Sequence, residues 1–360
     1  MSSYSNPKLT IVIPTYNEAE NIKVLVERLV DVLESNDIND FEVLVVDDNS
    51  PDGTCSIVKQ ISSRDQRIKC VLRVDEKGLA SAVVEGFRHA KGSYIVVMDA
   101  DLQHPPEIVP KLVRVLEEKG ADLAVASRYV KGGGVAGWSR IRLLMSRLGT
   151  IGVKLLVDET CKTTDPLAGF FAVRKDKLSI EKFRPRGFKI LIEILVQHPD
   201  LRVVDVPYVF QRRYAGQSKL GADVILDFLK QAWRFYPSFR VNISGLLGVF
   251  LYFIAVLYLT GIGRSLLGSL YVGAFMGFTG SLMAGVFLLN RVPPKDKLAW
   301  QVVGGIISAI LSPIISYALY VYLGIPLVSC IFLSVFLIFI SRKIVAGRNP
   351  TLLESVRHLS

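Results

Sequence analysis

Charge is nearly absent from the C-terminal part of this chain. Between Val241 and Ser341 only five residues are charged, and all five lie in the gaps between four apolar runs. The runs cover residues 241–262, 265–290, 298–324 and 325–341. Because a helix needs about 20 apolar residues to cross the hydrocarbon core of a membrane, and roughly 17 at the least, these runs predict four transmembrane helices. The alternative is the buried helical core of a soluble protein, which rarely has four adjoining runs of this length.

Cysteine is scarce as well. Cys55, Cys70, Cys161 and Cys330 have no metal-ligand spacing and no pattern of a disulfide scaffold, so we expect reduced thiols. The first seven residues contain no apolar core like that of a signal peptide, so the polar part of the chain should stay in the cytosol. Positive charge in the loop 291–297 and in the tail predicts that both termini are also cytosolic.

Nucleic-acid signals are missing, although the net charge is +10. Neither a zinc spacing nor a basic-aromatic repeat occurs, so we expect no nucleic acid as a partner. An anionic membrane surface, or a phosphate-bearing ligand, explains the charge better. The sequence leaves a homo-oligomer open.

The chain divides by composition into four parts. Residues 1–222 form a polar catalytic domain, 223–240 an interfacial amphipathic helix, 241–341 an all-helical membrane domain and 342–360 a cytosolic tail. The interfacial helix has its apolar residues on one side over 224–235, so it should lie flat on the membrane surface.

The catalytic domain alternates between strand and helix patterns. Strands are expected at residues 9–14, 41–47, 68–73 and 94–99, and helices at 19–33, from 54, and at 80–90. This alternation predicts a mostly parallel α/β sheet, flanked by helices, that binds ligands at the carboxyl ends of its strands. Neither a Gly-rich dinucleotide fingerprint nor a P-loop is present, so a phosphate-bearing ligand must be bound by another device.

Two aspartates at the end of the strand at 94–99 could be that device. In extended backbone residues i and i+2 point to the same side, so Asp99 and Asp101 could face one ion. Gln103 could add an amide oxygen. Hard oxygen ligands suit Mg²⁺ or Mn²⁺, which in turn bind diphosphates. Alone, an Asp-x-Asp pair is more often a solvated turn; its position directly after an apolar strand makes it more specific.

Several ordered motifs together resemble the inverting family-2 glycosyltransferases of GT-A fold, and among these the dolichyl-phosphate mannose synthases. They lie within residues 9–225 and comprise residues 13–18, 46–54, 99–106, 127–129, 169–171 and 213–220. One departure is Ala80, where relatives carry Gly, and some relatives also lack the four spans. The resemblance implies transfer of mannose from GDP-mannose to dolichyl phosphate, with inversion and with the help of a divalent metal.

The resemblance also implies roles for particular residues. The nucleotide sugar would lie against Pro14, Thr15, Tyr16, Glu18, Val46, Asp48, Lys77, Asp99, Ala100 and Asp101. Asp48 or Glu18 could accept hydrogen bonds from the base or ribose, although Asp48 could instead cap the turn that follows it. Asp165 corresponds to the base of relatives with hydroxyl acceptors, and here we expect it to position other groups.

A second basic element should bind the acceptor. Residues 139–157 have the pattern of an amphipathic helix that can lie in a membrane interface, with Arg142 and Ser146 on one side, where they could bind one phosphate. The alternative is an ordinary helix packed on the sheet, with a solvated basic face. Arg128, Arg213 and Lys219 complete the basic set. The glycines at 132–134 and 137 form either a flexible segment that closes over substrate or a passive linker.

Three other functions compete with the mannosyltransferase. A polyprenyl-phosphate glucosyltransferase would use UDP-glucose on the same fold. A processive polysaccharide synthase would use the spans as a channel, but the Gln-x-x-Arg-Trp order typical of such enzymes is missing from residues 231–234. A lipid-linked-sugar flippase with a degenerate domain is disfavoured because the Asp-x-Asp pair and the basic residues are intact.

Overall fold

The computed structural model describes residues 7–75, 77–183 and 189–214, together with residues 254, 265, 269, 270, 272, 273, 314 and 317. The chain forms two compact units, Met1–Arg234 and Phe235–Ser360, and the fold described here is that of the first. The predicted interfacial helix at 223–240, Lys219 and the tail lie outside the described residues, as do nearly all residues of the four predicted spans. Within the described part of the chain, no helix combines the length and apolar character needed to cross a membrane.

The first unit alternates strands with helices, as the sequence predicts. The strands are β1 (Leu9–Thr15), β2 (Phe41–Asp47), β3 (Ile68–Leu72), β4 (Tyr94–Val97), β5 (Leu123–Ser127), β6 (Gly134–Val135), β7 (Phe171–Arg174), β8 (Val203–Pro207) and β9 (Val209–Phe210). The α-helices are α1 (Ala19–Ser35), α2 (Thr54–Ser62), α3 (Leu79–His89), α4 (Val109–Glu118), α5 (Arg140–Leu156) and α6 (Ile190–Gln197).

Seven strands form one sheet in the order β3-β2-β1-β4-β7-β5-β8, and β6 pairs with β9 in a small second sheet. β1, β2, β3 and β4 are parallel, and β8 is parallel to β5. Only β7 runs against its two neighbours in this sheet, β4 and β5. The predicted α/β fold with a mostly parallel sheet is therefore confirmed, and the carboxyl ends of six strands share one edge.

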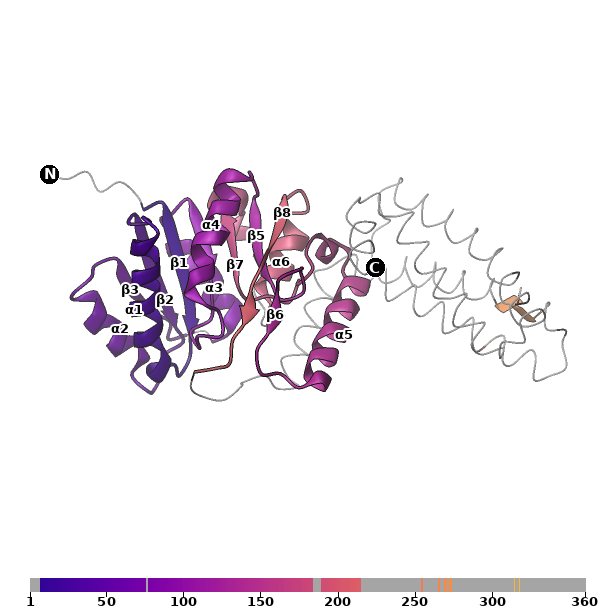
Figure 1. The fold of residues 1–360 in the computed structure, drawn as a ribbon, viewed down its shortest axis with the longest axis horizontal. Helices are drawn as coiled ribbons and strands as arrows, with labels where there is room; N and C mark the ends of the chain where they lie inside the picture. The colour runs from indigo at the N-terminus through magenta and orange to yellow at the C-terminus, as the bar shows by residue number, and fades with distance from the viewer. Residues whose placement is uncertain are drawn as a thin grey trace. The chain divides into compact units, whose positions relative to one another are not determined.

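Helices cover both faces of this sheet (Figure 1). One core cluster joins α1, α2 and α4 to the inward residues of β1 and β2, among them Ile11 and Val43. The other joins α3 and α6 to the residues that point the opposite way, among them Val12 and Leu44. Because successive residues of a strand face opposite sides, β1 and β2 are buried on both faces, which explains their continuous apolar runs.

Strand β4 ends two residues earlier than the sequence predicts. It stops at Val97, so Asp99 and Asp101 belong to the loop that follows and not to extended strand. Leu102 in this loop has a positive φ of 61°, which turns the chain sharply after the aspartates. The i, i+2 argument for a shared direction of the two carboxylates therefore does not apply here.

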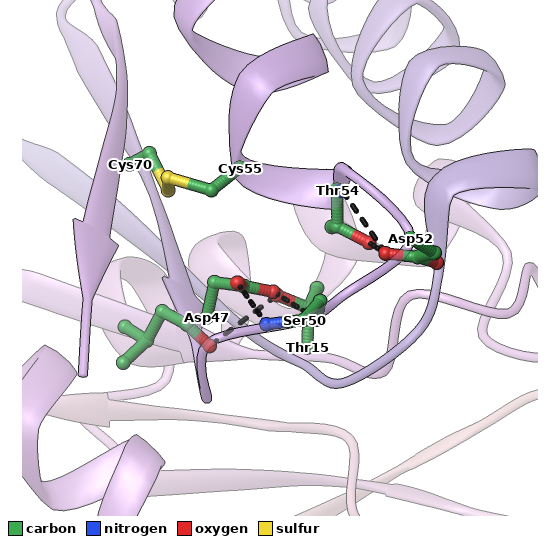
Figure 2. Close-up of a disulfide and its surroundings, with 8 residues drawn as sticks. Thr15, Asp47, Ser50, Asp52, Thr54, Cys55 and Cys70 are labelled. Carbon is green, nitrogen blue, oxygen red and sulfur yellow. Dashed lines mark hydrogen bonds between the residues drawn. A yellow bond between two sulfur atoms is a disulfide. The ribbon is translucent and has the colours of Figure 1, made fainter. Parts of the chain in front are cut away.

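The expectation of reduced thiols is wrong for one pair of cysteines. Cys55, in the first turn of α2, forms a disulfide with Cys70 of β3 (Figure 2). Helix α2 packs on β3, so the two Cα atoms lie 5.9 Å apart, within the range that a disulfide spans. Their separation of 15 residues matches no recognised motif, so the pairing could not be predicted from the sequence. The Cys161 thiol donates a hydrogen bond to the Lys154 backbone oxygen at 3.7 Å.

Candidate active site

The candidate site lies along the shared carboxyl edge of the main sheet. Thr15 and Asp47 end β1 and β2, Asp99 follows β4, and Arg128 follows β5. Residues with hydrogen-bonding or charged side chains meet here because parallel strands end at one edge. This is the position at which open α/β sheets bind their ligands.

The loops after β1 and β2 are joined by hydrogen bonds around Asp47 (Figure 2). Its carboxylate accepts bonds from the Thr15 hydroxyl at 2.9 Å, the Ser50 hydroxyl at 2.6 Å and the Ser50 amide at 2.9 Å. Asp52, just before α2, accepts from the amide and hydroxyl of Thr54 and from the Ala19 amide. These two aspartates therefore hold the loops after β1 and β2 in shape.

Asp48 does not cap the turn that follows it, because its carboxylate is bonded to residues further along the chain. One carboxylate oxygen accepts from Arg73 Nη1 at 2.6 Å, and the other accepts from the Gly78 amide at 2.7 Å. Burial raises the pKa of Asp48, against the lowering effect of the Gly78 hydrogen bond and the Arg73 charge. Each carboxylate oxygen has a second lone pair, so Asp48 can still accept a bond from a base or ribose.

The other residues predicted to bind the nucleotide-sugar donor surround this loop. Pro14, Thr15 and Val46 are buried, whereas Tyr16 and Lys77 are exposed, with the Lys77 ammonium 5.1 Å from the centre of the Tyr16 ring. Ala80, the departure from the family pattern, is buried in the first turn of α3 directly after the Gly78 cap. A small side chain fits this buried first turn of the helix.

Glu18 lies at the start of α1. Its amide donates to the Thr54 hydroxyl at 3.1 Å, and its carboxylate accepts from the Asn21 side chain at 2.7 Å. Glu18 thus joins the loops after β1 and β2 and still offers a carboxylate to the site.

Asp99 and Asp101 come together in the loop after β4. Asp101 is buried, whereas the Asp99 side chain is 39% exposed although protein groups surround it. Desolvation raises the pKa of both carboxyl groups, and the charge of Asp99 raises the pKa of Asp101 further. Ala100, between them, is buried. The Gln103 amide nitrogen donates to the backbone oxygen of Gln211 at 3.1 Å.

These groups fit a divalent cation. Two carboxylates in a confined site repel each other, and a cation between them would remove that cost. Gln103 supplies a hard amide oxygen, and Mg²⁺ is commonly held by one or two carboxylates plus the phosphates of its substrate. The described residues contain no cluster of three His, Cys, Asp or Glu side chains. Asp99, Asp101 and the Gln103 amide oxygen are the groups that would hold such a cation.

Arg128 and Asp165 form a buried, two-pronged ion pair. Arg128 donates from Nε at 2.7 Å and from Nη2 at 2.8 Å to the two carboxylate oxygens. The Arg128 side chain is 10% exposed and that of Asp165 is fully buried. Burial disfavours the guanidinium charge, but the bonds to Asp165 outweigh it and raise the pKa of Arg128. With both oxygens bound to Arg128, Asp165 has the geometry of a positioning group.

Arg213 contacts the aspartate motif directly. Its guanidinium lies 2.8 Å from the Asp101 carboxylate, and the Tyr214 amide donates to the Asp101 backbone oxygen. The Gln211 amide likewise donates to the Gln103 backbone oxygen at 3.0 Å. The segment after β9 is therefore bound along the loop after β4, although the two are more than a hundred residues apart in sequence.

Helix α5 exposes its apolar side. Ser139 caps its first turn by accepting from the Arg142 amide, and Ser146 exchanges a hydrogen bond of 2.7 Å with the Tyr129 hydroxyl. Ile141 is 75% exposed, and Leu144, Met145, Leu148 and Ile151 are also exposed. Helix α5 is therefore not an ordinary helix that packs on the sheet through its apolar face. Lys154 is half-buried, and burial lowers its pKa.

The glycine segment before α5, predicted to be either a closing segment or a passive linker, contacts the rest of the fold. Gly134 pairs with Val209 in the small sheet, and a Cβ at Gly133 would lie 2.6 Å from the Ser127 backbone oxygen. The segment therefore lies directly against the chain around β5 and β9.

Sequence reasoning missed three residues of the site. His104 is buried, stacks on Phe170, and accepts the Asp99 amide hydrogen at Nδ1, and burial lowers its pKa to about 4. Lys189 lies near Asp99, and burial lowers its pKa to about 8. Trp138 lies against Arg128 and Arg142. His104 stood within a quoted motif, but Lys189 and Trp138 had no periodic or spacing signal.

Comparisons with known proteins identify the family of this chain. Residues 10–180 match Glycosyl transferase family 2. The chain is 43% identical over 227 residues to a dolichol-phosphate mannosyltransferase of Pyrococcus furiosus, with 63% of each chain covered. It is 36% identical over 260 residues to the protein of that name from Saccharomyces cerevisiae, covering 69% of this chain and 94% of that one. For the Mycosarcoma maydis protein of that name the identity is 34% over 245 residues, covering 65% and 81%.

One solved structure of low sequence identity is also similar. Mannosyl-3-phosphoglycerate synthase from Rubrobacter xylanophilus has 18% identity and a TM-score of 0.49, over 63% of this chain and 73% of that one. The sequence relatives carry the assignment, since the yeast protein is matched over nearly its whole length. The GT-A-like α/β fold implied by the motifs agrees with the family match. The chain belongs to glycosyl transferase family 2 and, within it, to the group of the dolichol-phosphate mannosyltransferases.

Proposed function

We propose that this enzyme transfers mannose from GDP-mannose to dolichyl phosphate, with inversion at the anomeric carbon. The observation that carries the proposal is the meeting of Asp99 and Asp101 with Arg128 and Arg213 at one sheet edge. Carboxylates suited to a metal diphosphate and arginines suited to a second phosphate are the two parts that such a transfer needs. The relatives are dolichol-phosphate mannosyltransferases by name, which supports both the sugar and the lipid acceptor.

On the donor side, the residues at the ends of β1 and β2 hold the nucleotide. Asp48, kept in place by Arg73 and Gly78, would accept hydrogen bonds from the guanine edge or the ribose. Asp99, Asp101 and Gln103 would hold Mg²⁺ or Mn²⁺, which when bound neutralises the charge of the departing diphosphate. Lys77 on the exposed rim of the site would add a positive charge near the phosphates.

On the acceptor side, the lipid phosphate needs no strong base. A phosphate monoester has a second pKa near 6, so it is largely dianionic at neutral pH and can attack directly. Arg128, Arg142, Ser146 and Arg213, with Lys219, would bind and orient it opposite the leaving group. Asp165 would act by holding the Arg128 guanidinium, since both its oxygens are bonded to that side chain.

The reaction can be tested by identifying the product. The full chain in phospholipid vesicles with dolichyl phosphate is given radiolabelled GDP-mannose or UDP-glucose, each with Mn²⁺. We expect lipid-linked mannose from GDP-mannose and little product from UDP-glucose. Lipid-linked glucose would favour the glucosyltransferase, and water-soluble polymer would favour a polysaccharide synthase. Calorimetry should also show GDP binding at least about tenfold tighter than UDP, a difference of about 1.4 kcal/mol.

We further propose that the enzyme is an integral membrane protein whose catalytic unit lies on the cytosolic surface. The exposed apolar side of α5 and the four apolar runs support this placement. Disulfides are rare in reducing compartments such as the cytosol. The Cys55–Cys70 disulfide therefore makes the side of the membrane the point to test. Protease accessibility in sealed vesicles of known orientation decides it, because a catalytic unit cleaved only from the lumenal side would contradict the proposal.

A further inference from the structure

Trp138 occupies a central place among the residues that would bind the acceptor. It lies between β6 and α5 and is half-buried. The Arg142 guanidinium carbon is 4.4 Å from the centre of its ring system, and that of Arg128 is 5.8 Å away. A cation within about 6 Å of an indole face is attracted by the ring quadrupole. One aromatic side chain thus contacts two arginines that come from different elements.

Trp138 is itself held by an aromatic contact that leads to the aspartate motif. Its indole packs edge-on against Phe210 of β9 at 5.6 Å, and Phe210 packs against His104 at 5.7 Å. His104 in turn accepts the Asp99 amide hydrogen. The position of Trp138 is therefore fixed relative to the residues that would bind the donor diphosphate.

Backbone geometry also fixes Trp138. The preceding Gly137 has a φ of 74°, in the left-handed region that favours glycine. A Cβ at Gly137 would lie 2.4 Å from Nε of Arg212. The Ala136 amide donates to the Phe210 backbone oxygen at 2.8 Å, which extends the pairing of β6 with β9 up to this turn. A larger residue at 137 would therefore strain this turn and displace the Arg212 side chain.

The guanidinium groups of Arg128 and Arg142 differ in their hydrogen-bond and ion-pair partners. Arg128 donates hydrogen bonds from Nε and Nη2 to Asp165. Among the described residues, none accepts a hydrogen bond from its Nη1. Arg142 is exposed, and within the described part of the chain it has no acidic partner. Without an anion, two guanidinium groups repel each other, and an exposed arginine samples many rotamers. A shared aromatic contact opposes both effects.

We propose that Trp138 is a positioning residue for the acceptor phosphate: its indole holds the guanidinium groups of Arg128 and Arg142 together so that both can bind one phosphate. The inference rests on the proposed function for the identity of the acceptor. It assigns to Trp138 a role in acceptor affinity and none in donor binding. A preorganised pair of arginines binds phosphate more tightly because the side chains lose less conformational entropy on binding.

The test compares W138L and W138F with the wild type in the full chain reconstituted in phospholipid vesicles. We expect the KM for dolichyl phosphate to rise about tenfold in W138L and less in W138F, which keeps an aromatic face. The KM for GDP-mannose and the affinity for GDP with Mn²⁺ should stay within about twofold of wild type. Y94L is the matched control, because Tyr94 contacts Arg174 at 5.5 Å at the opposite end of β4.

A double-mutant cycle separates positioning from a general structural role. If Trp138 acts largely through Arg142, the KM of R142A/W138L should rise by clearly less than the product of the two single effects. Independent, multiplying effects would overturn the proposal, as would an unchanged acceptor KM in W138L. Loss of GDP binding in both W138L and W138F would also overturn it, because Trp138 would then support the fold.

Direct binding keeps the inference separate from the proposed function. Binding of a short polyprenyl phosphate, citronellyl phosphate, is measured by calorimetry without donor. If the wild type transfers no sugar but binds this phosphate about tenfold more tightly than W138L does, the proposed reaction fails and the role of Trp138 stands. Equal binding by both proteins, or none by the wild type, overturns the inference.

Discussion

The donor and acceptor sides of the site are built in different ways. On the donor side, Asp47, Asp48 and Asp52 bond to neighbours within about thirty residues, and the strands that carry them are buried on both faces. On the acceptor side, Asp101 contacts Arg213, Trp138 contacts Phe210, and α5 exposes its apolar side. The central sheet forms the first side, whereas two distant loops meeting at the β6–β9 pair form the second. Changes on the acceptor side should therefore alter acceptor binding and leave donor binding intact.

The largest effect is expected where the two sides meet, at Asp101. Replacing Asp101 by Asn removes a metal ligand and the partner of Arg213 together. We expect kcat to fall by about 10³-fold, because stabilisation of leaving-group charge is often the largest catalytic contribution. Steady-state kinetics measures this, and circular dichroism checks that the fold is retained. Chelator should inactivate the wild type and Mn²⁺ should restore it; full activity in EDTA would contradict the metal assignment.

Breaking the buried pair on the acceptor side should cost stability as well as activity. Asp165→Asn leaves the Arg128 guanidinium buried without its counter-charge. The expected loss is about 3–5 kcal/mol in the free energy of unfolding. Urea unfolding of the catalytic unit, followed in the full chain in detergent, measures it. Lys177→Ala is the control, because its contact with Asp122 is long and exposed, and should change stability by less than about 1 kcal/mol.

Removing the disulfide tests the donor side alone. Closing a loop of 15 residues is expected to stabilise the fold by about 3 kcal/mol, through the unfolded chain. The double variant C55S/C70S should lose about that much, and reductant should lower the stability of the wild type equally. The KM for dolichyl phosphate should not change, because neither cysteine lies near Arg142. A variant as stable as the wild type would mean that the thiols are not joined in solution.

The smallest of these effects concerns one exposed arginine. Arg142→Ala should raise the KM for dolichyl phosphate about thirtyfold, since one charge-assisted phosphate contact contributes about 2 kcal/mol. Arg140→Ala removes an equal charge from the same helix and controls for general attraction to the membrane. Similar kinetics in the two variants would show that Arg142 has no specific phosphate contact.

Local patterns predicted the donor side well. The continuous apolar runs of β1 and β2 indicated buried parallel strands, and the turn residues after them fell where the ligand edge lies. The partners of Asp48 could not be predicted, because Arg73 and Gly78 reach it only after β3 and α3 have packed. The disulfide was missed for the same reason: its cysteines meet through the contact of α2 with β3.

The acceptor side shows where sequence reasoning ends. The pattern of α5 and its Ser139 cap could be predicted, since both are local. The contact of Asp101 with Arg213 and that of Arg142 with Trp138 depend on how the β6–β9 pair brings two loops together, which no periodicity encodes. The predicted spans and Lys219 lie outside the described residues and stay predictions.

The reversed strand β7 determines how the chain can vary. Phe171 at its start pairs with Val97 and Val125, close to the carboxyl ends of β4 and β5. The chain therefore arrives at the active edge just before β7, and this arriving segment carries Asp165 beside Arg128 and Gly169 beside Asp99. The chain between β5 and that segment, which includes α5, forms an excursion: it leaves the carboxyl edge of the sheet and then returns to it. Insertions or deletions within the excursion would therefore change the acceptor side, to which it contributes Trp138 and Arg142, while Asp99 and Asp165 keep their places at the edge.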